Sequence, residues 1–219
     1  ESLEADRRCH AIVLAAQGTA FCAGANFATR DATPEQRSPR GLNPLYAEAL
    51  RLFACSKPVV AAVHGPAIGG GLGLALVADF RVTCAEARFS ANFNRLGFHP
   101  GFGLSVTLPR LVGAQQAALL FDTGRRIGGE EALRIGLADV LTAQDQVRAK
   151  AAELAREIAA SAPIAVQATR ATLRQGLVEQ IRLAVARESE LQNAQFKTAD
   201  FREGVAAMAA RREPQFKGE

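Results

Sequence analysis

Four glycines lie close together at a point where a helix is expected to begin. They are Gly69, Gly70, Gly71 and Gly73, in the segment GPAIGGGLGLALVADF that starts at Gly65. Inside a helix, glycine costs roughly 1 kcal/mol relative to alanine. The first turn of a helix presents unpaired backbone N–H groups, and glycine has no side chain to keep a ligand away from them. The run therefore indicates either a site where the N–H of Gly70 stabilises a ligand oxygen, or close packing of a helix on a strand.

A second run of small residues favours the first interpretation. In GTAFCAGANF, from Gly18, the residues Ala23, Gly24 and Ala25 follow an apolar run. Two such segment ends side by side would supply two backbone donors to one oxygen, which is an oxyanion site. A nucleotide-binding α/β protein is the weaker alternative, because the chain has no GxGxxG and no Lys-Ser/Thr after the glycines.

The elements around these runs predict an α/β core. Short strands are expected in AIVLAA from Ala11, VVAAVHG from Val59, DFRVTCA from Asp79 and ARFSA from Ala87. In the third of these, Phe80, Val82 and Cys84 are expected on one side of the strand and Arg81 and Thr83 on the other. Helices are expected in LYAEALRLFA, from Leu45, and in LGLALVA directly after the glycines. Strands and helices that alternate at this spacing indicate parallel strands with crossover connections.

The C-terminal third is expected to be mostly helical. Apolar residues recur at helical spacing in LPRLVGAQQAALLF, VRAKAAELAREIAA and EQIRLAVARESELQNAQF, and Pro163 marks a helix start. By contrast, the segment FATRDATPEQRSPRGLNP, from Phe27, is rich in proline, glycine and polar residues and predicts an irregular loop.

Composition limits the classes of function. The chain has 219 residues, 48% hydrophobic and 22% charged, with a net charge of +4. Its basic residues are spread out, so a small anionic ligand fits the charge and nucleic-acid binding is disfavoured. The sequence has no apolar run of the ~18 residues that span a membrane and no signal-peptide pattern, so we expect a cytoplasmic protein. The four cysteines form no CxxC pair, and we expect reduced thiols and no metal site.

The motifs together resemble those of the crotonase, or enoyl-CoA hydratase/isomerase, family. The resemblance rests on FCAGAN followed by KPVVAAVHGPAIGGG. It continues through ADFRVTCAEARFS, LPRLVG, TGRRIGGEEALRIGLADVL and DFREGVAAMAARREPQFKG, so it covers nearly all of the chain in order. The resemblance implies a spiral of ββα units at 1–140 and a helical C-terminal region at 141–219 that builds homotrimers or homohexamers. The family's opening strands are expected to have no counterpart here.

The resemblance also implies a ligand and a site. The ligand is an acyl-CoA thioester, with coenzyme A as part of the substrate and no other cofactor. The N–H groups of Ala25 and Gly70 would hold the thioester oxygen and stabilise an enolate. The residues expected to contact the substrate are Ala23, Gly24, Asn26, Phe27, Ile68, Gly69, Gly71, Gly73, Phe93, Leu96 and Gly101.

The chain differs from the family where acids are expected. Hydratases of the family carry two glutamates, whose positions correspond to Gly73 and Phe93, and several isomerases carry an acid at the position of Gly101. Hydration by two carboxylates is therefore disfavoured. A smaller departure is Asn26, which replaces the usual Asp and caps a turn equally well.

Other polar residues are candidates for the missing acid–base group. His99 is the first choice, and the alternative is that it stabilises its Pro-Gly turn. His64 is expected to be structural. Asn92 and Asn94 are expected on a strand, on the face opposite Phe93.

The irregular loop contributes further candidates. Asp31 and Tyr46 border it and could reach the pocket if the loop folds over, and Arg30, Arg37 and Arg40 could meet the coenzyme phosphates. The leading prediction is an enolate-forming acyl-CoA enzyme of the hydratase/isomerase class. The alternative is a crotonase-fold protein without catalysis that binds acyl-CoA or serves as an assembly subunit.

Overall fold

The central element is an open sheet of four parallel strands. The computed structural model describes residues 2–25 and 44–219. In spatial order the strands are β1 (Ile12–Ala15), β2 (Val59–Val63), β4 (Phe80–Thr83) and β7 (Val140–Leu141). Each neighbouring pair is parallel, with Ile12 opposite Val59 and Val60 opposite Phe80. Every residue of β2 is buried, as expected for an unbroken apolar strand covered on both faces.

A second, smaller sheet carries the glycine-rich segment. Its strands are β3 (Ala67–Ile68), β5 (Arg88–Ser90) and β6 (Arg126–Gly128). β3 pairs with β5 in parallel, and β5 pairs with β6 in antiparallel orientation. Helix α3 (Gly70–Ala75) begins just after β3, with Gly69 between them. The glycines therefore lie at the end of a strand and in the first turn of a helix.

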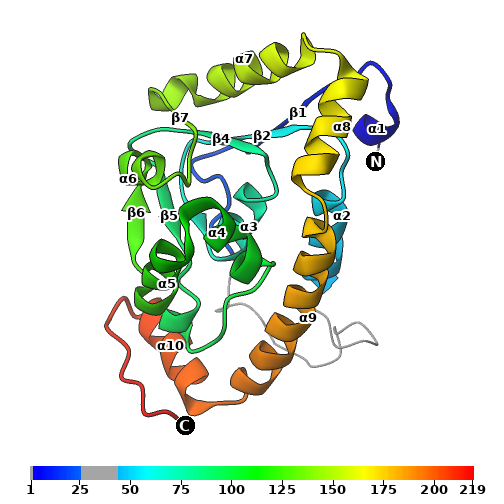
Figure 1. The fold of residues 1–219 in the computed structure, drawn as a ribbon. Coiled ribbons are helices and arrows are strands. Elements are labelled where there is room, and N and C mark those ends of the chain that lie inside the picture. Colours follow the sequence, from blue (N-terminus) through cyan, green and yellow to red (C-terminus); the bar gives the residue numbers. More distant parts are fainter. Residues whose placement is uncertain (1, 26–43) are drawn as a thin grey trace.

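Helices surround the two sheets and extend along one side of the molecule (Figure 1). The longer ones are α2 (Pro44–Phe53), α4 (Leu104–Val112), α5 (Ala114–Thr123), α7 (Val147–Ala159), α8 (Pro163–Leu173), α9 (Leu177–Gln195) and α10 (Ala199–Ala209). The shorter ones are α1 (Ser2–Ala5), α6 (Gly129–Arg134) and the 3-10 turns η2 (Asn94–Leu96) and η3 (Gln144–Gln146). α7 packs on β1, β2 and β4, α9 packs on α2 and α4, and α10 packs on η2.

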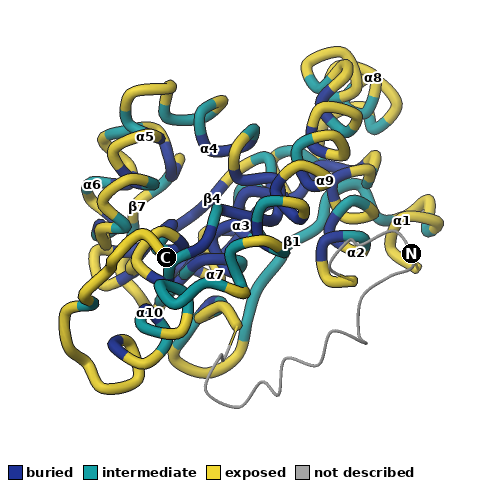
Figure 2. The backbone as a smooth tube through the Cα atoms, turned by 90° about the horizontal axis from the view of Figure 1, so that it is seen from below, coloured by how far each residue is buried: buried dark blue, intermediate teal, exposed yellow. Residues whose placement is uncertain are grey.

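Helix α8 differs from its neighbours because it has no buried residue. The tube view shows it exposed over much of its length, at the edge of a molecule whose buried residues gather around α3 and β4 (Figure 2). Ile164 and Leu173, two of its large apolar side chains, are 85% and 69% exposed. None of the helices in the described ranges is long and apolar enough to cross a membrane.

The structure confirms the α/β class, the four predicted strands and the helical C-terminal third. α8 begins at Pro163, as predicted. The short strands β3, β6 and β7 were not predicted, because two or three residues carry too little periodicity to detect. The predicted domain boundary at residue 140 lies within β7 and stays a prediction. The four cysteines are free thiols, although only Cys84 is fully buried.

One local prediction was wrong. β5 ends at Ser90, so Phe93 is not on a strand; it precedes η2, and Gly97, which follows η2, is in the left-handed conformation. In β4, Arg81 is buried and Phe80 is partly exposed, which the predicted alternation did not specify. Arg81 is satisfied there because its guanidinium donates to the carbonyl oxygens of Leu137 and Ala78 and to the Asp139 carboxylate.

Candidate active site

The two segments of small residues lie side by side. Cys22 and Ala67 form a parallel bridge, in which the N–H of Cys22 donates to Pro66 and the N–H of Ile68 donates to Cys22. Beyond this bridge, Ala25 and Gly70 line the same cavity. In the described ranges, neither of their backbone N–H groups donates to another residue. The role of these two groups as oxyanion donors stays a prediction.

The glycines of the run have different roles. A Cβ at Gly71 would overlap the carbonyl oxygen of Cys22 and lie 2.7 Å from its carbonyl carbon. A Cβ at Gly70 would meet nothing closer than the ring of Phe102, at 4.0 Å. Close packing therefore explains Gly71, whereas the space beside Gly70 is open. The packing interpretation therefore applies to Gly71, and the oxyanion role of Gly70 stays a prediction.

A cavity of about 740 Å³ opens at these segments. It is lined by eight of the predicted site residues: Ala23, Gly24, Ala25, Ile68, Gly69, Gly70, Phe93 and Leu96. The other apolar and aromatic lining includes Leu45, Ala49, Leu52, Leu74, Phe98, Phe102, Phe196 and Met208. Ionisable side chains at its wall are Cys22, Tyr46, Glu48, Arg88 and Arg126. The volume and the mostly apolar wall suit a small organic ligand.

An aromatic side chain fills the space beside Gly73. A Cβ there would lie 2.7 Å from the Cβ, Cγ and Cδ1 atoms of Phe102. Phe102 is buried, and its φ of 66° is in the left-handed region that a bulky residue rarely adopts. Its ring makes edge contacts with the rings of Tyr46 and Phe53. Gly73 therefore has no room for a side chain while Phe102 keeps this position.

The spaces at Gly101 and Phe93 are also occupied. A Cβ at Gly101 would overlap the Tyr46 hydroxyl and lie 2.5 Å from Nε2 of Gln192. The Tyr46 hydroxyl donates to Oε1 of Gln192 at 3.2 Å, which joins α2 to α9 behind this turn. Phe93 is buried and packs edge-on against Phe98, with ring centroids 5.5 Å apart. Aromatic side chains thus close all three positions.

A buried carboxylate fixes the turn that holds Phe102. Glu188 of α9 is 1% exposed and accepts hydrogen bonds from the N–H groups of Gly103 and Ser105, at 2.8 and 3.1 Å, and from the Ser105 hydroxyl. These N–H groups lie at the start of α4, where a negative charge is favourable. Burial raises the pKa of Glu188, although the hydrogen bonds from Ser105 and Gly103 oppose the shift.

The two histidines singled out by the sequence lie away from the cavity wall. His99 is half-buried. Its Nδ1 faces the carbonyl oxygen of Pro100, and its backbone N–H donates to Oε1 of Gln195. His64 pairs through Nε2 with the carbonyl oxygen of Gly18, a contact that suits the structural role expected of it. Neither is among the residues that line the cavity. The acid–base role of His99 stays a prediction.

The remaining predicted residues have mixed placements. Gly71, Gly73 and Gly101 pack behind the wall, while Asn92 lines the cavity and Asn94 is exposed. Outside the described residues lie Asn26, Phe27, Arg30, Asp31, Arg37 and Arg40. Three charged cavity-lining residues were not predicted from the sequence: Glu48, Arg88 and Arg126. Glu48 could have been noticed as a charge within the apolar repeat of α2. No sequence pattern indicated the two arginines.

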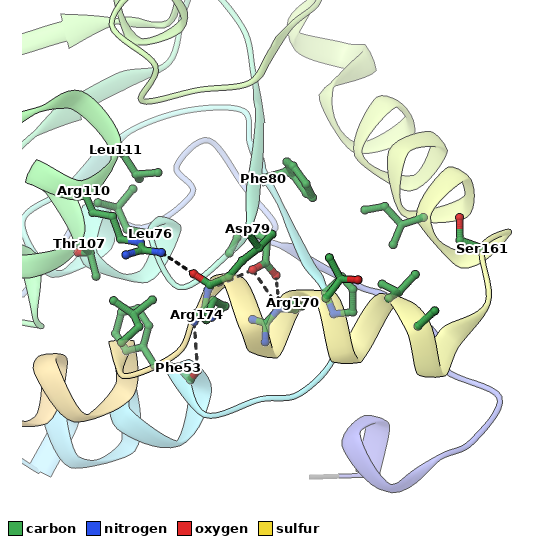
Figure 3. A pocket seen from close by; sticks show the side chains of 18 of the residues that line it. Phe53, Leu76, Asp79, Phe80, Thr107, Arg110, Leu111, Ser161, Arg170 and Arg174 are labelled. Carbon is green, nitrogen blue, oxygen red and sulfur yellow. Dashed lines mark hydrogen bonds and ion pairs between the residues drawn. The ribbon is translucent and has the colours of Figure 1, made fainter.

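A second cavity of about 620 Å³ lies between α8 and the body of the molecule (Figure 3). Its wall is mostly apolar and includes Phe80, Leu111 and Val166. Asp79 accepts hydrogen bonds here from Arg170 and Arg174 of the α8 segment, at 2.8 to 3.1 Å. In the part of the chain that the structure describes, no group of three or more His, Cys, Asp or Glu residues could hold a metal ion.

The chain is similar to known proteins of one class. The family model described as enoyl-CoA hydratase/isomerase matches residues 1–219. A solved enoyl-CoA hydratase/isomerase from Pseudoalteromonas atlantica T6c superposes with a TM-score of 0.87 at 32% identity, over 99% of this chain and 85% of that one. The molecule therefore has the crotonase fold.

Two curated relatives carry hydratase names. The chain is 38% identical to the short-chain-enoyl-CoA hydratase of Clostridium acetobutylicum, over 74% of this chain and 62% of that protein. It is 33% identical to the crotonyl-CoA hydratase of Syntrophomonas wolfei, over 94% of this chain and 79% of that protein. The chain belongs to the enoyl-CoA hydratase/isomerase family.

Proposed function

We propose that the protein binds an acyl-CoA thioester and stabilises its enolate between the N–H groups of Ala25 and Gly70. The observation that supports this proposal is that Ala25 and Gly70, whose segments are joined by the Cys22–Ala67 bridge, line one cavity. The mostly apolar wall suits an acyl group, and Arg88 and Arg126 supply positive charge for an anionic coenzyme. Family membership supports the same ligand class.

The chemistry follows from the two donors. Removal of the proton on the carbon next to the thioester carbonyl leaves an electron pair that moves onto the thioester oxygen. Two fixed N–H groups stabilise that negative charge, and loss of one such donor typically costs ~3 kcal/mol of transition-state binding. Return of the proton to the same or another carbon completes an exchange or a double-bond shift.

Hydration by paired glutamates does not fit the chain. The positions where the family's acids are expected are Gly73, Phe93 and Gly101, and aromatic side chains fill the space at each. A water molecule would find no carboxylate there to orient it. Proton transfer on the thioester is therefore favoured over addition of water.

The second candidate is an acyl-CoA binder or assembly subunit without catalysis. The three positions that lack an acid favour it. The two small-residue segments at one cavity count against it, since binding alone does not require a pair of backbone donors.

Solvent exchange distinguishes the two candidates. In D₂O, with saturated and unsaturated acyl-CoA thioesters, the protein is expected to catalyse incorporation of deuterium at the α-carbon, measured by mass spectrometry. Thioether analogues, which lack the carbonyl oxygen, serve as the control and should show no exchange. Binding by calorimetry without exchange for any thioester would reject the enzyme and leave the binder.

We propose further that the chain assembles into homotrimers or homohexamers through α8. Its exposed Ile164 and Leu173 and the apolar cavity behind it support this. Light scattering is expected to give three or six times the 23.2 kDa of one chain. Replacing Ile164 and Leu173 together with glutamate should give monomers, whereas Leu133→Glu on α6 should not. An unchanged mass for the double variant would contradict the α8 interface.

A further inference from the structure

Helix α2 presents a carboxylate to the cavity from an apolar stripe. Leu45, Glu48, Ala49 and Leu52 recur at the spacing of one helical face, and all four line the cavity. Leu45 and Leu52 are 51% and 45% exposed, because the cavity in front of them is open. A charged residue is unexpected within such a stripe, because charged residues normally lie on the opposite, solvent-facing side of a helix.

The helix is fixed relative to the oxyanion donors. Tyr46, beside the stripe, packs edge-on against Phe102 with ring centroids 6.0 Å apart. Phe102 in turn is the nearest side chain to the open space beside Gly70. The contact from Tyr46 to Gln192 attaches the same helix to α9. α2 therefore lies on the wall that faces the Gly70 segment, held by two buried contacts.

Glu48 is the one carboxylate among the described residues that line this cavity. Its side chain is 65% exposed, and Oε2 pairs with Nη1 of Arg51 at 2.5 Å. The partner comes from the same helix, so the carboxylate can face the cavity without breaking a link to another element. Entry of an acyl group against Leu45 and Leu52 would take water away from Glu48 and strengthen its interaction with the ligand.

We propose that Glu48 is the base that takes the α-proton of the bound thioester. This rests on the proposed function. The α-carbon–hydrogen bond breaks, its proton goes to the Glu48 carboxylate, and its electron pair goes to the thioester oxygen held by Ala25 and Gly70. The protonated Glu48 then returns a proton to carbon, so no other reactant is needed. The substrate class is an acyl-CoA with an acidic α-hydrogen.

The other ionisable groups fit this role less well. The Tyr46 hydroxyl is engaged with Gln192, and His99 lies behind the wall with Nδ1 against Pro100. Arg88 donates to the carbonyl oxygens of Ala85 and Ala87, and an arginine does not act as a base at neutral pH. Glu48, by contrast, has a carboxylate that can accept a proton, and it lines the cavity.

The test compares Glu48→Gln with Glu179→Gln in the α-deuterium exchange assay. Glu179 on α9 is a matched control: it pairs with Arg182 three residues on, is 59% exposed and does not line the cavity. Glu48→Gln is expected to lower the exchange rate by about 10²- to 10⁴-fold while the Kd for the thioester stays within a few-fold. Glu48→Asp should retain part of the rate, and Glu179→Gln should match the wild type.

The pH profile separates a base from a merely structural residue. A loss of exchange rate toward acid in the wild type should be absent from the residual rate of Glu48→Gln. If the wild type is active and Glu48→Gln exchanges at the same rate, the proposed role of Glu48 is wrong and the proposed function still stands. If the wild type binds thioesters but exchanges none, the proposed function fails, and the role of Glu48 fails with it.

Discussion

Replacing Gly71 with alanine is expected to destabilise the protein by about 3 kcal/mol, because two rigid backbone segments would have to separate. The new Cβ would overlap the carbonyl oxygen of Cys22, whose segment is held by its bridge to Ala67. A native domain is stable by only about 5–15 kcal/mol, so the loss is readily measured by urea unfolding. We expect a lower midpoint and an unchanged slope.

Gly70→Ala is the matched control for this substitution. The new Cβ would have no neighbour closer than 4.0 Å. Alanine also has a higher helix propensity than glycine at this first position of α3. Stability is expected to stay within about 0.5 kcal/mol of the wild type. The α-deuterium exchange should nevertheless fall by about 10²-fold, because the methyl group restricts approach of the thioester oxygen to the Gly70 N–H.

The two outcomes separate packing from ligand access. If Gly70→Ala destabilises the chain as much as Gly71→Ala, the whole run serves packing and Gly70 has no special role. If Gly70→Ala is stable and retains full exchange in an active protein, Gly70 is not a donor. Only a stable variant that has lost exchange agrees with the proposed oxyanion site.

Asp79→Asn is expected to cost about 3 kcal/mol, because it leaves two largely buried guanidinium groups without their carboxylate. Asp79, Arg170 and Arg174 have side chains only 15%, 11% and 15% exposed. Burial and the charge of Arg170 lower the pKa of Arg174, and Asp79 opposes that shift. Asparagine can still accept the hydrogen bond from the N–H of Val59, so the substitution mainly removes the charge.

Because Asp79 joins α8 to the parallel sheet, the loss should appear first in that helix (Figure 3). Thermal unfolding gives the total change, and hydrogen exchange should show weaker protection in residues 163–173. The control is Glu131→Gln, whose exposed pair with Arg134 should be worth less than about 0.5 kcal/mol. If Asp79→Asn lowers the free energy of unfolding no more than Glu131→Gln does, then packing, rather than this ion-pair cluster, holds α8 in place.

Much of the fold follows from local sequence patterns. The runs at 12–15 and 59–63 are continuous and apolar, and both form strands. The second run is buried along its whole length, as expected for a central parallel strand. Pro163 starts its helix because its fixed φ suits the first turn. The burial of Arg81 was not predicted, because its partners include the distant Leu137 and Asp139 and alternation along a strand carries no information about them.

The sequence by itself determined the family and the positions of the two small-residue runs. Each of these features lies in a short contiguous segment, so the order of residue types in that segment is enough to recognise it. Only the tertiary structure decided that Phe102 fills the space beside Gly73, that Tyr46 fills the space beside Gly101 and that Glu48 faces the cavity. These contacts join residues far apart in the chain, and they depend on how α2, α4 and α9 pack around α3. Periodicity within one segment cannot specify that packing.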